Sequence, residues 1–196
     1  MRIGIDIDDT ISDTYEVVVA YAQKYTINEL NKEAKLNDII AQHHSYVAKM
    51  HNWNYDEEVN FWQKYYGEII KNVKPFTFSV ETINKLRDEG NKIVIVTARW
   101  PEPNWDVNEL SRKWLKENNI NYDDIVFNAQ DKGKVAVEKK LDLLIDDSFQ
   151  NCKSVADNGI KSFIIQTRIN KGLEDKRITR VYSWPDIYNR IKEEKF

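Results

Sequence analysis

The chain has 196 residues, of which 41% are hydrophobic and 31% charged, with six glycines and four prolines. This length fits one folded core with an insertion, and the composition excludes a linker or a disordered tail. The net charge of −3 disfavours a nucleic-acid polymer as a partner, and the single cysteine, Cys152, excludes an intrachain disulfide and a thiolate metal cluster.

The sequence predicts a cytoplasmic protein with no membrane partner. Its beginning reaches Asp6 before an apolar signal segment can develop, and no apolar run is long enough to span a bilayer. A lone cysteine also fits a reducing compartment. The sequence leaves the oligomeric state open.

The first part of the chain combines one strand with a long helical segment. Residues 2–7 are a short apolar run that predicts a buried strand. The segment 14–73 holds no convincing strand pattern, so we expect several helices there, and Pro75 marks its end because proline disfavours helix in the preceding residue. We therefore predict a helical insertion, 14–73, in a core made of residues 1–13 and 74–196.

The rest of the chain alternates between strand and helix patterns. Strands are predicted at 92–96, 125–127, 141–145, 162–166 and 180–182, and helices at 77–89, 106–118, 148–158 and from about Trp184. Gly90 and Gly159 stand where two of these helices should end. This alternation is typical of an α/β fold with a parallel sheet.

Carboxylates follow the first predicted strand, at Asp6, Asp8 and Asp9. Open α/β sheets bind ligands at this edge, and a cluster of negative charge there needs a cation such as Mg²⁺, which prefers oxygen ligands. An EF-hand calcium loop counted from Asp6 is excluded, because Ile11 replaces the required glycine and Val17 the required glutamate.

Further polar groups are predicted to reach the same edge of the sheet. Hydroxyl and backbone N–H groups after a second strand could hold phosphoryl oxygens, and an ammonium at the start of a helix could neutralise both a nucleophile and a phosphate. These candidates are Thr97, Ala98 and Arg99, the basic residues Lys132 and Lys134, and the acidic pair Asp146 and Asp147. For Arg99, a structural ion pair is an equally good interpretation.

In their order and in their places at strand ends, these residues resemble the four motifs of the haloacid dehalogenase (HAD) superfamily, although the spacing from Lys132 to Asp146 is longer than in close relatives. The matching positions are Asp6, Asp8 and Thr10, then Thr97, then Lys132 or Lys134, then Asp146 and Asp147. The resemblance implies the HAD fold, a three-layer Rossmann-like parallel sheet core, with the helical insertion as a cap of the C1 type.

The resemblance also implies roles for these residues. Asp6 would attack phosphorus and form an aspartyl-phosphate, with Asp8 as general acid and then general base. Mg²⁺ would lie on Asp6, on the backbone carbonyl of Asp8 and on one member of the second acidic pair, with Asp147 preferred as the ligand and Asp146 orienting it. Thr97 and Lys132 would act on the phosphate, although Lys134 remains an alternative lysine. Asp9 is expected to be a turn or capping residue.

Three phrases, 96–99, 112–115 and 120–127, look like those of the 5′(3′)-deoxyribonucleotidase family and its bacterial relatives. This narrower resemblance implies a Mg²⁺-dependent phosphomonoesterase for a small phosphorylated metabolite, a nucleoside monophosphate. The alternatives are a phosphatase for a sugar phosphate or phosphoglycolate, and a receiver-like module that is phosphorylated on Asp without turnover. The base, the sugar and the position of the phosphate are not specified by the sequence.

The predicted insertion is rich in aromatic and histidine side chains: His43, His44, Tyr46, His51, Trp53, Trp62, Tyr65 and Tyr66. Such rings can stack on a nucleobase, but at helical spacing they more often pack a small domain against itself. A metal site at His43 and His44 is disfavoured, because neighbouring helical residues do not face each other. We expect the loop 100–105 to border the entrance to the site.

Overall fold

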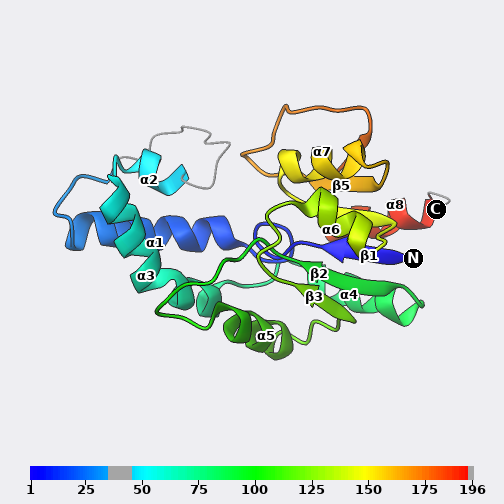
Figure 1. Ribbon diagram of the computed structural model, residues 1–196, viewed down its shortest axis with the longest axis horizontal. Coiled ribbons are helices and arrows are strands. Elements are labelled where there is room, and N and C mark those ends of the chain that lie inside the picture. The colour runs from blue at the N-terminus through cyan, green and yellow to red at the C-terminus, as the bar shows by residue number, and fades with distance from the viewer. Residues whose placement is uncertain (35–45, 194–196) are drawn as a thin grey trace.

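A six-stranded parallel sheet forms the centre of the computed structural model, which describes residues 1–34 and 46–193 (Figure 1). The strands are β1 (Arg2–Ile5), β2 (Lys92–Val96), β3 (Asp124–Val126), β4 (Leu143–Asp146), β5 (Lys161–Ile165) and β6 (Ile178–Val181). Their order in the sheet is β3-β2-β1-β4-β5-β6, and every neighbouring pair is parallel. The predicted parallel α/β core is confirmed.

Helices cover both faces of this sheet and make it the middle of three layers. The helices of the core are α4 (Ser79–Asp88), α5 (Val107–Glu117), α6 (Lys132–Glu138), α7 (Phe149–Asp157) and α8 (Trp184–Glu193). Successive residues of a strand point to opposite faces, so Ile93 and Ile95 of β2 pack in one apolar cluster with α4, α5 and α8, and Val94 and Val96 pack in another with α6 and α7. Burial on both faces explains why these strands are continuous apolar runs.

The predicted boundaries differ from the observed ones by one or two residues. One of the two-residue shifts concerns the first strand, predicted at 2–7, which ends at Ile5. Beyond it the chain turns, and the N–H groups of Thr10, Ile11 and Ser12 all donate to the carbonyl of Ile7. The apolar Ile7 is therefore buried in a turn and not in the sheet.

Three helices separate β1 from the rest of the core: α1 (Thr14–Asn28), α2 (Tyr46–Met50) and α3 (Tyr55–Asn72). They lie at one end of the molecule, and the two termini lie at the other (Figure 1). The two connections to the core run side by side, because Asp13 N–H donates to the carbonyl of Lys74 and Phe76 N–H to that of Ile11. Among the described residues, no helix is both long and apolar enough to cross a membrane.

Most of the aromatic side chains predicted in this segment pack against one another. Phe61 lies between Trp53, Tyr25 and Tyr65, with ring centroids 4.8, 5.6 and 5.6 Å away. His43 and His44 lie outside the described residues. Trp62 and Tyr66 instead lie near the core, against Trp100.

Candidate active site

The carboxyl ends of the neighbouring strands β1 and β4 bring a lysine between two aspartates. Lys132 Nζ lies 2.5 Å from Asp6 Oδ1 and 2.7 Å from Asp146 Oδ2, and the lysine side chain is only 1% exposed. Burial alone would lower the pKa of Lys132, but the two carboxylates outweigh it and raise that pKa, so the ammonium stays charged. The lysine therefore offsets part of the negative charge of the site.

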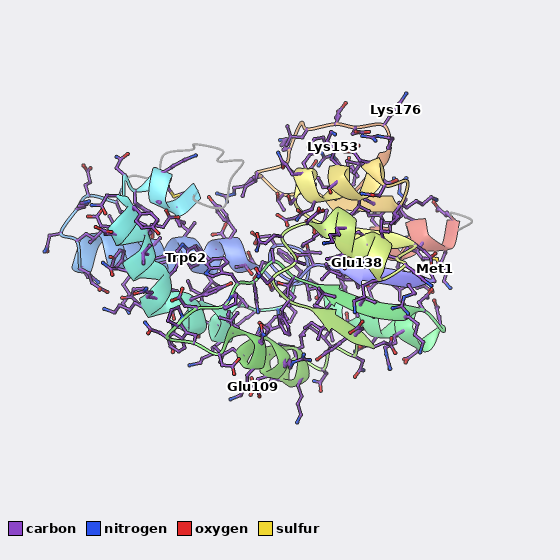
Figure 2. All side chains as sticks on the ribbon, viewed as in Figure 1. Met1, Trp62, Glu109, Glu138, Lys153 and Lys176 are labelled. Atoms are coloured by element: carbon purple, nitrogen blue, oxygen red, sulfur yellow. The ribbon has the colours of Figure 1, made fainter. Side chains whose placement is uncertain are left out.

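Helix α6 explains why Lys132 and not Lys134 reaches this position. Asp131 caps the helix by accepting the N–H of Lys134, and a Cβ on Gly133 would lie 2.3 Å from Ser154 Oγ of α7, so the start of α6 packs closely on α7. Lys134, two residues on, points to solvent with a side chain 72% exposed and lies 3.9 Å from Glu138 (labelled in Figure 2). The Lys134 side chain therefore lies outside the acidic cluster, and the structure favours Lys132 as the lysine of the third motif.

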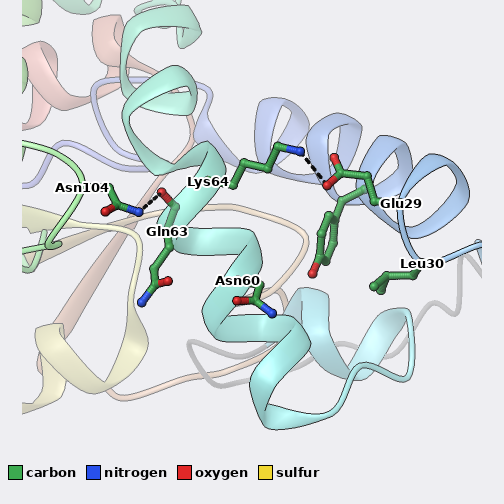
Figure 3. A pocket seen from close by; sticks show the side chains of 7 residues that line it. Glu29, Leu30, Asn60, Gln63, Lys64 and Asn104 are labelled. Atoms are coloured by element: carbon green, nitrogen blue, oxygen red, sulfur yellow. Dashed lines mark hydrogen bonds and ion pairs between the residues drawn. The ribbon is translucent and has the colours of Figure 1, made fainter.

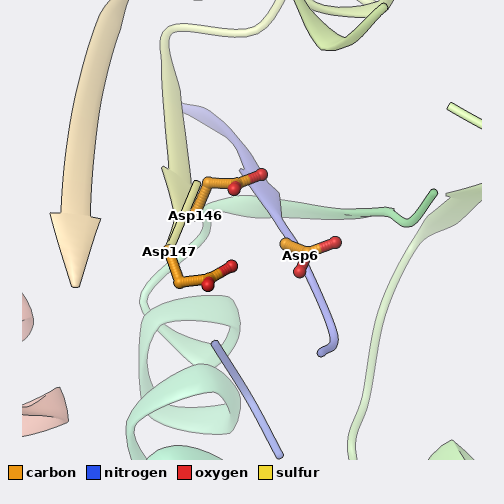
Figure 4. Close-up of side chains that lie close together, drawn as sticks. All are labelled: Asp6, Asp146 and Asp147. Carbon is orange, nitrogen blue, oxygen red and sulfur yellow. The ribbon is translucent and has the colours of Figure 1, made fainter. Parts of the chain in front are cut away.

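Asp6, Asp146 and Asp147 each place a carboxylate oxygen within 4.8 Å of the others (Figure 4). The Asp146 carboxylate accepts from Lys132, from the N–H of Ser148 and from the Asn151 amide, whereas that of Asp147 accepts no hydrogen bond from the described residues. Burial, followed by the charges of Asp146, Asp9 and Asp6, raises the pKa of Asp147 well above its ordinary value. Burial likewise raises the pKa of Asp6 to about 7.

This donor set fits a Mg²⁺ ion. The ion takes carboxylate and carbonyl oxygens, and Asp147 presents a carboxylate that accepts no hydrogen bond from the described residues. Asp146 is already used by Lys132 and its own helix, which agrees with the predicted division between a ligand, Asp147, and an orienting residue, Asp146.

Asp8, the second aspartate of the first motif, is paired with Arg99. The Arg99 Nε and Nη2 atoms donate to the two carboxylate oxygens at 2.9 and 2.8 Å, and Thr14 Oγ1 donates to Oδ1 at 2.8 Å. Burial would raise the pKa of Asp8, but Arg99 outweighs it and lowers that pKa. Of the two interpretations of Arg99, the structure shows the ion pair.

The second motif lies beside this pair. Thr97 is fully buried, and its Oγ1 accepts the N–H of Arg99 at 3.2 Å, while Ala98 lines the open cavity. Asp9 has a φ of 55° and its carboxylate accepts the N–H groups of Thr14 and Tyr15, so it caps the start of α1 as expected.

A cavity of about 970 Å³ connects these groups to α3. On the α3 side it is lined at helical spacing by Tyr55, Glu58, Val59, Trp62, Tyr66 and Ile69, and Trp62 is labelled in Figure 2. Trp100 completes this wall, with its ring stacked on Tyr66 at 4.5 Å. The sequence predicted the rings of Trp62 and Tyr66 and a loop at the entrance. It gave no signal for Glu58, Val59 or Ile69, because a helix face with residues at three- or four-residue spacing has the same pattern whether it packs on a core or lines a cavity.

A second cavity, of about 490 Å³, lies between α1, α3 and Asn104 (Figure 3). Its polar groups are bonded to each other, with Lys64 on Glu29 and Asn104 on the carbonyl of Gln63. None of the predicted site residues lines it. The chemistry therefore belongs to the larger cavity.

Comparison with known proteins agrees with this geometry. A curated nucleotidase of Clostridium acetobutylicum is 27% identical to the chain over 192 residues, which are 97% of this chain and 93% of that protein. A haloacid dehalogenase-like hydrolase of Streptococcus pneumoniae has the same fold, with a TM-score of 0.70, 15% identity and 97% of each chain covered. A HAD family hydrolase of Deinococcus radiodurans, solved with bound phosphate and sodium, gives a TM-score of 0.68 at 12% identity, covering 98% of this chain and 95% of its own.

The resemblance to the superfamily and the narrower resemblance to the nucleotidase family are both confirmed. The strand order also separates the chain from a receiver-like module, whose flavodoxin-like order is 2-1-3-4-5. The model of the family described as "5' nucleotidase, deoxy (Pyrimidine), cytosolic type C protein" matches residues 1–196. The chain therefore belongs to this nucleotidase family and is a phosphatase of the haloacid dehalogenase superfamily.

Proposed function

We propose that the chain is a cytoplasmic, Mg²⁺-dependent phosphomonoesterase that hydrolyses nucleoside monophosphates through a phosphorylated Asp6. The observation that carries this proposal is the shape and lining of the large cavity, which runs from the acidic cluster to the ring wall formed by Trp62, Tyr66 and Trp100. A phosphate at one end and a flat, uncharged ring system at the other would match these two surfaces.

The charges of the cavity favour a substrate with a single phosphate. Arg99 and Lys132 are the only cationic residues among those that line it in the described chain, and both are paired with carboxylates. Glu58 adds a negative charge to the α3 wall. A second phosphate on the leaving group would find no free cation there, whereas a neutral nucleoside would not need one. The apolar wall also supports a nucleoside over the small polar sugar phosphate or phosphoglycolate.

Mg²⁺ would be held by Asp6, by the backbone carbonyl of Asp8 and by Asp147. Asp146 would orient the ion from nearby. When bound, it would supply positive charge that offsets the repulsion between these carboxylates and an anionic substrate. Asp6 would then attack phosphorus with one carboxylate oxygen while Lys132 donates a hydrogen bond to the other, Oδ1. The buried Thr97 and the N–H groups of its turn would bind phosphoryl oxygens.

Asp8 would serve both halves of the reaction. Because Arg99 lowers its pKa, Asp8 would first take a proton from the monoanionic phosphate ester and pass it to the oxygen of the departing nucleoside. It would later take a proton from the water that hydrolyses the phosphorylated Asp6. The helical insertion, residues 14–73, would act as a cap over the core of residues 1–13 and 74–196. Closure would bend the paired connections near 13–14 and 73–75, which are joined by backbone hydrogen bonds between Asp13 and Lys74 and between Ile11 and Phe76.

The test is phosphate release with Mg²⁺ from nucleoside monophosphates, sugar phosphates and phosphoglycolate. We expect the highest kcat/KM on nucleoside monophosphates and no turnover by Asp6→Asn. Asp88→Asn, an exposed aspartate at the end of α4, is the matched control and should keep wild-type turnover. A preference for sugar phosphates would refute the substrate, and an active Asp6→Asn variant would refute the mechanism.

A further inference from the structure

All three nitrogen atoms of the Arg99 guanidinium donate hydrogen bonds to other residues of the protein. Two of them form the paired contact with Asp8, and the third, Nη1, donates to Ser111 Oγ at 2.9 Å. The arginine side chain is 2% exposed. Three of its five N–H donors are thus used by protein acceptors, and a phosphate could not take the Nε and Nη2 side of the guanidinium without displacing Asp8.

Ser111 anchors the guanidinium of Arg99 through the nitrogen that does not contact Asp8. Its hydroxyl donates to the carbonyl of Val107 at 2.7 Å, one turn earlier in α5, and so presents its oxygen to Arg99 as an acceptor. Val107 in turn packs with Tyr66 and Ile70 of α3. Arg99 is therefore anchored to a helix that is itself packed on the cavity wall.

The contacts of Asp8 leave one direction open. Oδ1 accepts from Arg99 and from Thr14, which fills both of its lone pairs, whereas Oδ2 accepts from Arg99 alone among the described residues. One lone pair on Oδ2 thus remains for a proton. The arginine decides which way that lone pair points, because a bidentate contact fixes the plane of the carboxylate.

Moving Arg99 onto a phosphate would be unfavourable. It would break two charge-assisted hydrogen bonds and leave Asp8 without its cation in a cavity that also holds Asp6, Asp9 and Asp147. Carboxylates gathered at short range repel one another when no cation offsets their charge.

We infer that Arg99 is a positioning residue for the reaction: anchored by Ser111, it holds the Asp8 carboxylate so that Oδ2 faces the leaving-group oxygen, and it does not bind the phosphate. This inference rests on the proposed function, because it needs a phosphate ester as substrate. It also replaces the expectation from the sequence that Arg99 binds substrate.

The inference makes a prediction about leaving groups. Proton donation by Asp8 accelerates the departure of a nucleoside, which is a poor leaving group, far more than that of p-nitrophenolate, which leaves without a proton. A misplaced Asp8 should therefore slow the nucleotide selectively. The ratio of kcat/KM for the two esters reports this, because it covers the steps up to the departure of the alcohol and not the later hydrolysis of the phosphorylated Asp6.

The experiment compares Arg99→Lys and Ser111→Ala with wild type on a nucleoside monophosphate and on p-nitrophenyl phosphate. Lysine cannot reach both oxygens of Asp8, so we expect kcat/KM for the nucleotide to fall about 10- to 100-fold and that for p-nitrophenyl phosphate less than about threefold. Inhibition by inorganic phosphate should keep its wild-type constant. Ser111→Ala should shift the ratio in the same direction by a smaller factor, and it carries the test if Arg99→Lys does not fold.

The matched control is Arg87→Lys. Arg87 makes the same bidentate contact with Asp123, but at the far end of the sheet and on the surface, so the control should leave the ratio unchanged. An equal loss on both esters together with weaker inhibition by phosphate would overturn the inference and make Arg99 a phosphate ligand. Wild-type protein that releases phosphate from no ester would instead refute the proposed function and the inference with it.

Discussion

Replacing Lys132 with methionine removes the ammonium between Asp6 and Asp146 and keeps most of the apolar volume of the side chain. Two buried carboxylates then face each other beside Asp147. Removing one partner of a buried ion pair costs about 3–5 kcal/mol of unfolding free energy. With a urea slope of about 2 kcal/mol per molar, a loss of about 4 kcal/mol would lower the unfolding midpoint by about 2 M.

The assay is urea unfolding followed by circular dichroism at pH 8, with EDTA and with Mg²⁺. Mg²⁺ should recover part of the loss, since a ligand at about 100 times its dissociation constant stabilises the folded state by about 2.7 kcal/mol. Lys134→Met is the control on the same helix. It removes only an exposed contact with Glu138, so its unfolding free energy should stay within about 0.5 kcal/mol of wild type and its turnover should persist.

Two results would refute this reasoning. If Lys132→Met and Lys134→Met unfold at the same urea concentration in EDTA, the buried ammonium does not offset the carboxylates. If turnover is lost in Lys134→Met and kept in Lys132→Met, the wrong lysine has been assigned to the site.

Three further predictions concern the helical segment. Burial lowers the pKa of His51 below 6.5, and both ring nitrogens lack a partner among the described residues. The unfolded chain therefore binds the proton first as the pH falls, so between pH 7.5 and 5.5 wild type should lose up to about 1.4 kcal/mol more stability than His51→Gln. Equal changes of stability with pH in the two proteins, measured by pH-dependent melting, would contradict this. In Gly67→Ala a Cβ would lie 2.1 Å from the ring of Trp105, so we expect a loss of about 1–3 kcal/mol in urea unfolding despite the helix preference of alanine, and a more stable variant would disprove the contact. Glu58→Gln should raise the relative kcat/KM for nucleoside 3′,5′-bisphosphates several-fold over monophosphates, and an unchanged ratio would show that Glu58 does not select against the second phosphate.

The sequence was sufficient for the parts of the site that lie at strand ends. Asp6, Thr97 and Asp146 each follow an apolar run, and parallel strands place such residues at one edge of the sheet. The fold follows from the same runs, because burial on both faces makes each strand visible as an uninterrupted apolar segment.

Other parts of the site depend on packing that no local pattern records. Lys132 and Lys134 are the same residue type at the start of the same helix, so the sequence does not distinguish them. The close contact of α6 with α7 decides which of the two side chains is buried. The pairing of Asp8 with Arg99 joins residues 91 positions apart. Both residues could be singled out from the sequence, but the sequence could not show that Arg99 forms an ion pair with Asp8.

The position of β1 in the sheet has a consequence for how the protein folds. β1 precedes the other five strands in the chain and is the third of six in the sheet, and its residue Ile3 pairs with Ile93 and Leu143, which are synthesised about 90 and 140 residues later. Both edges of β1 therefore stay unpaired until β2 is made, one edge stays unpaired until β4 is made, and pairing at such separations is slow. A nascent chain that has not yet been extended through Asp147 lacks the second acidic pair, so catalytic competence arises only after β4 has been made.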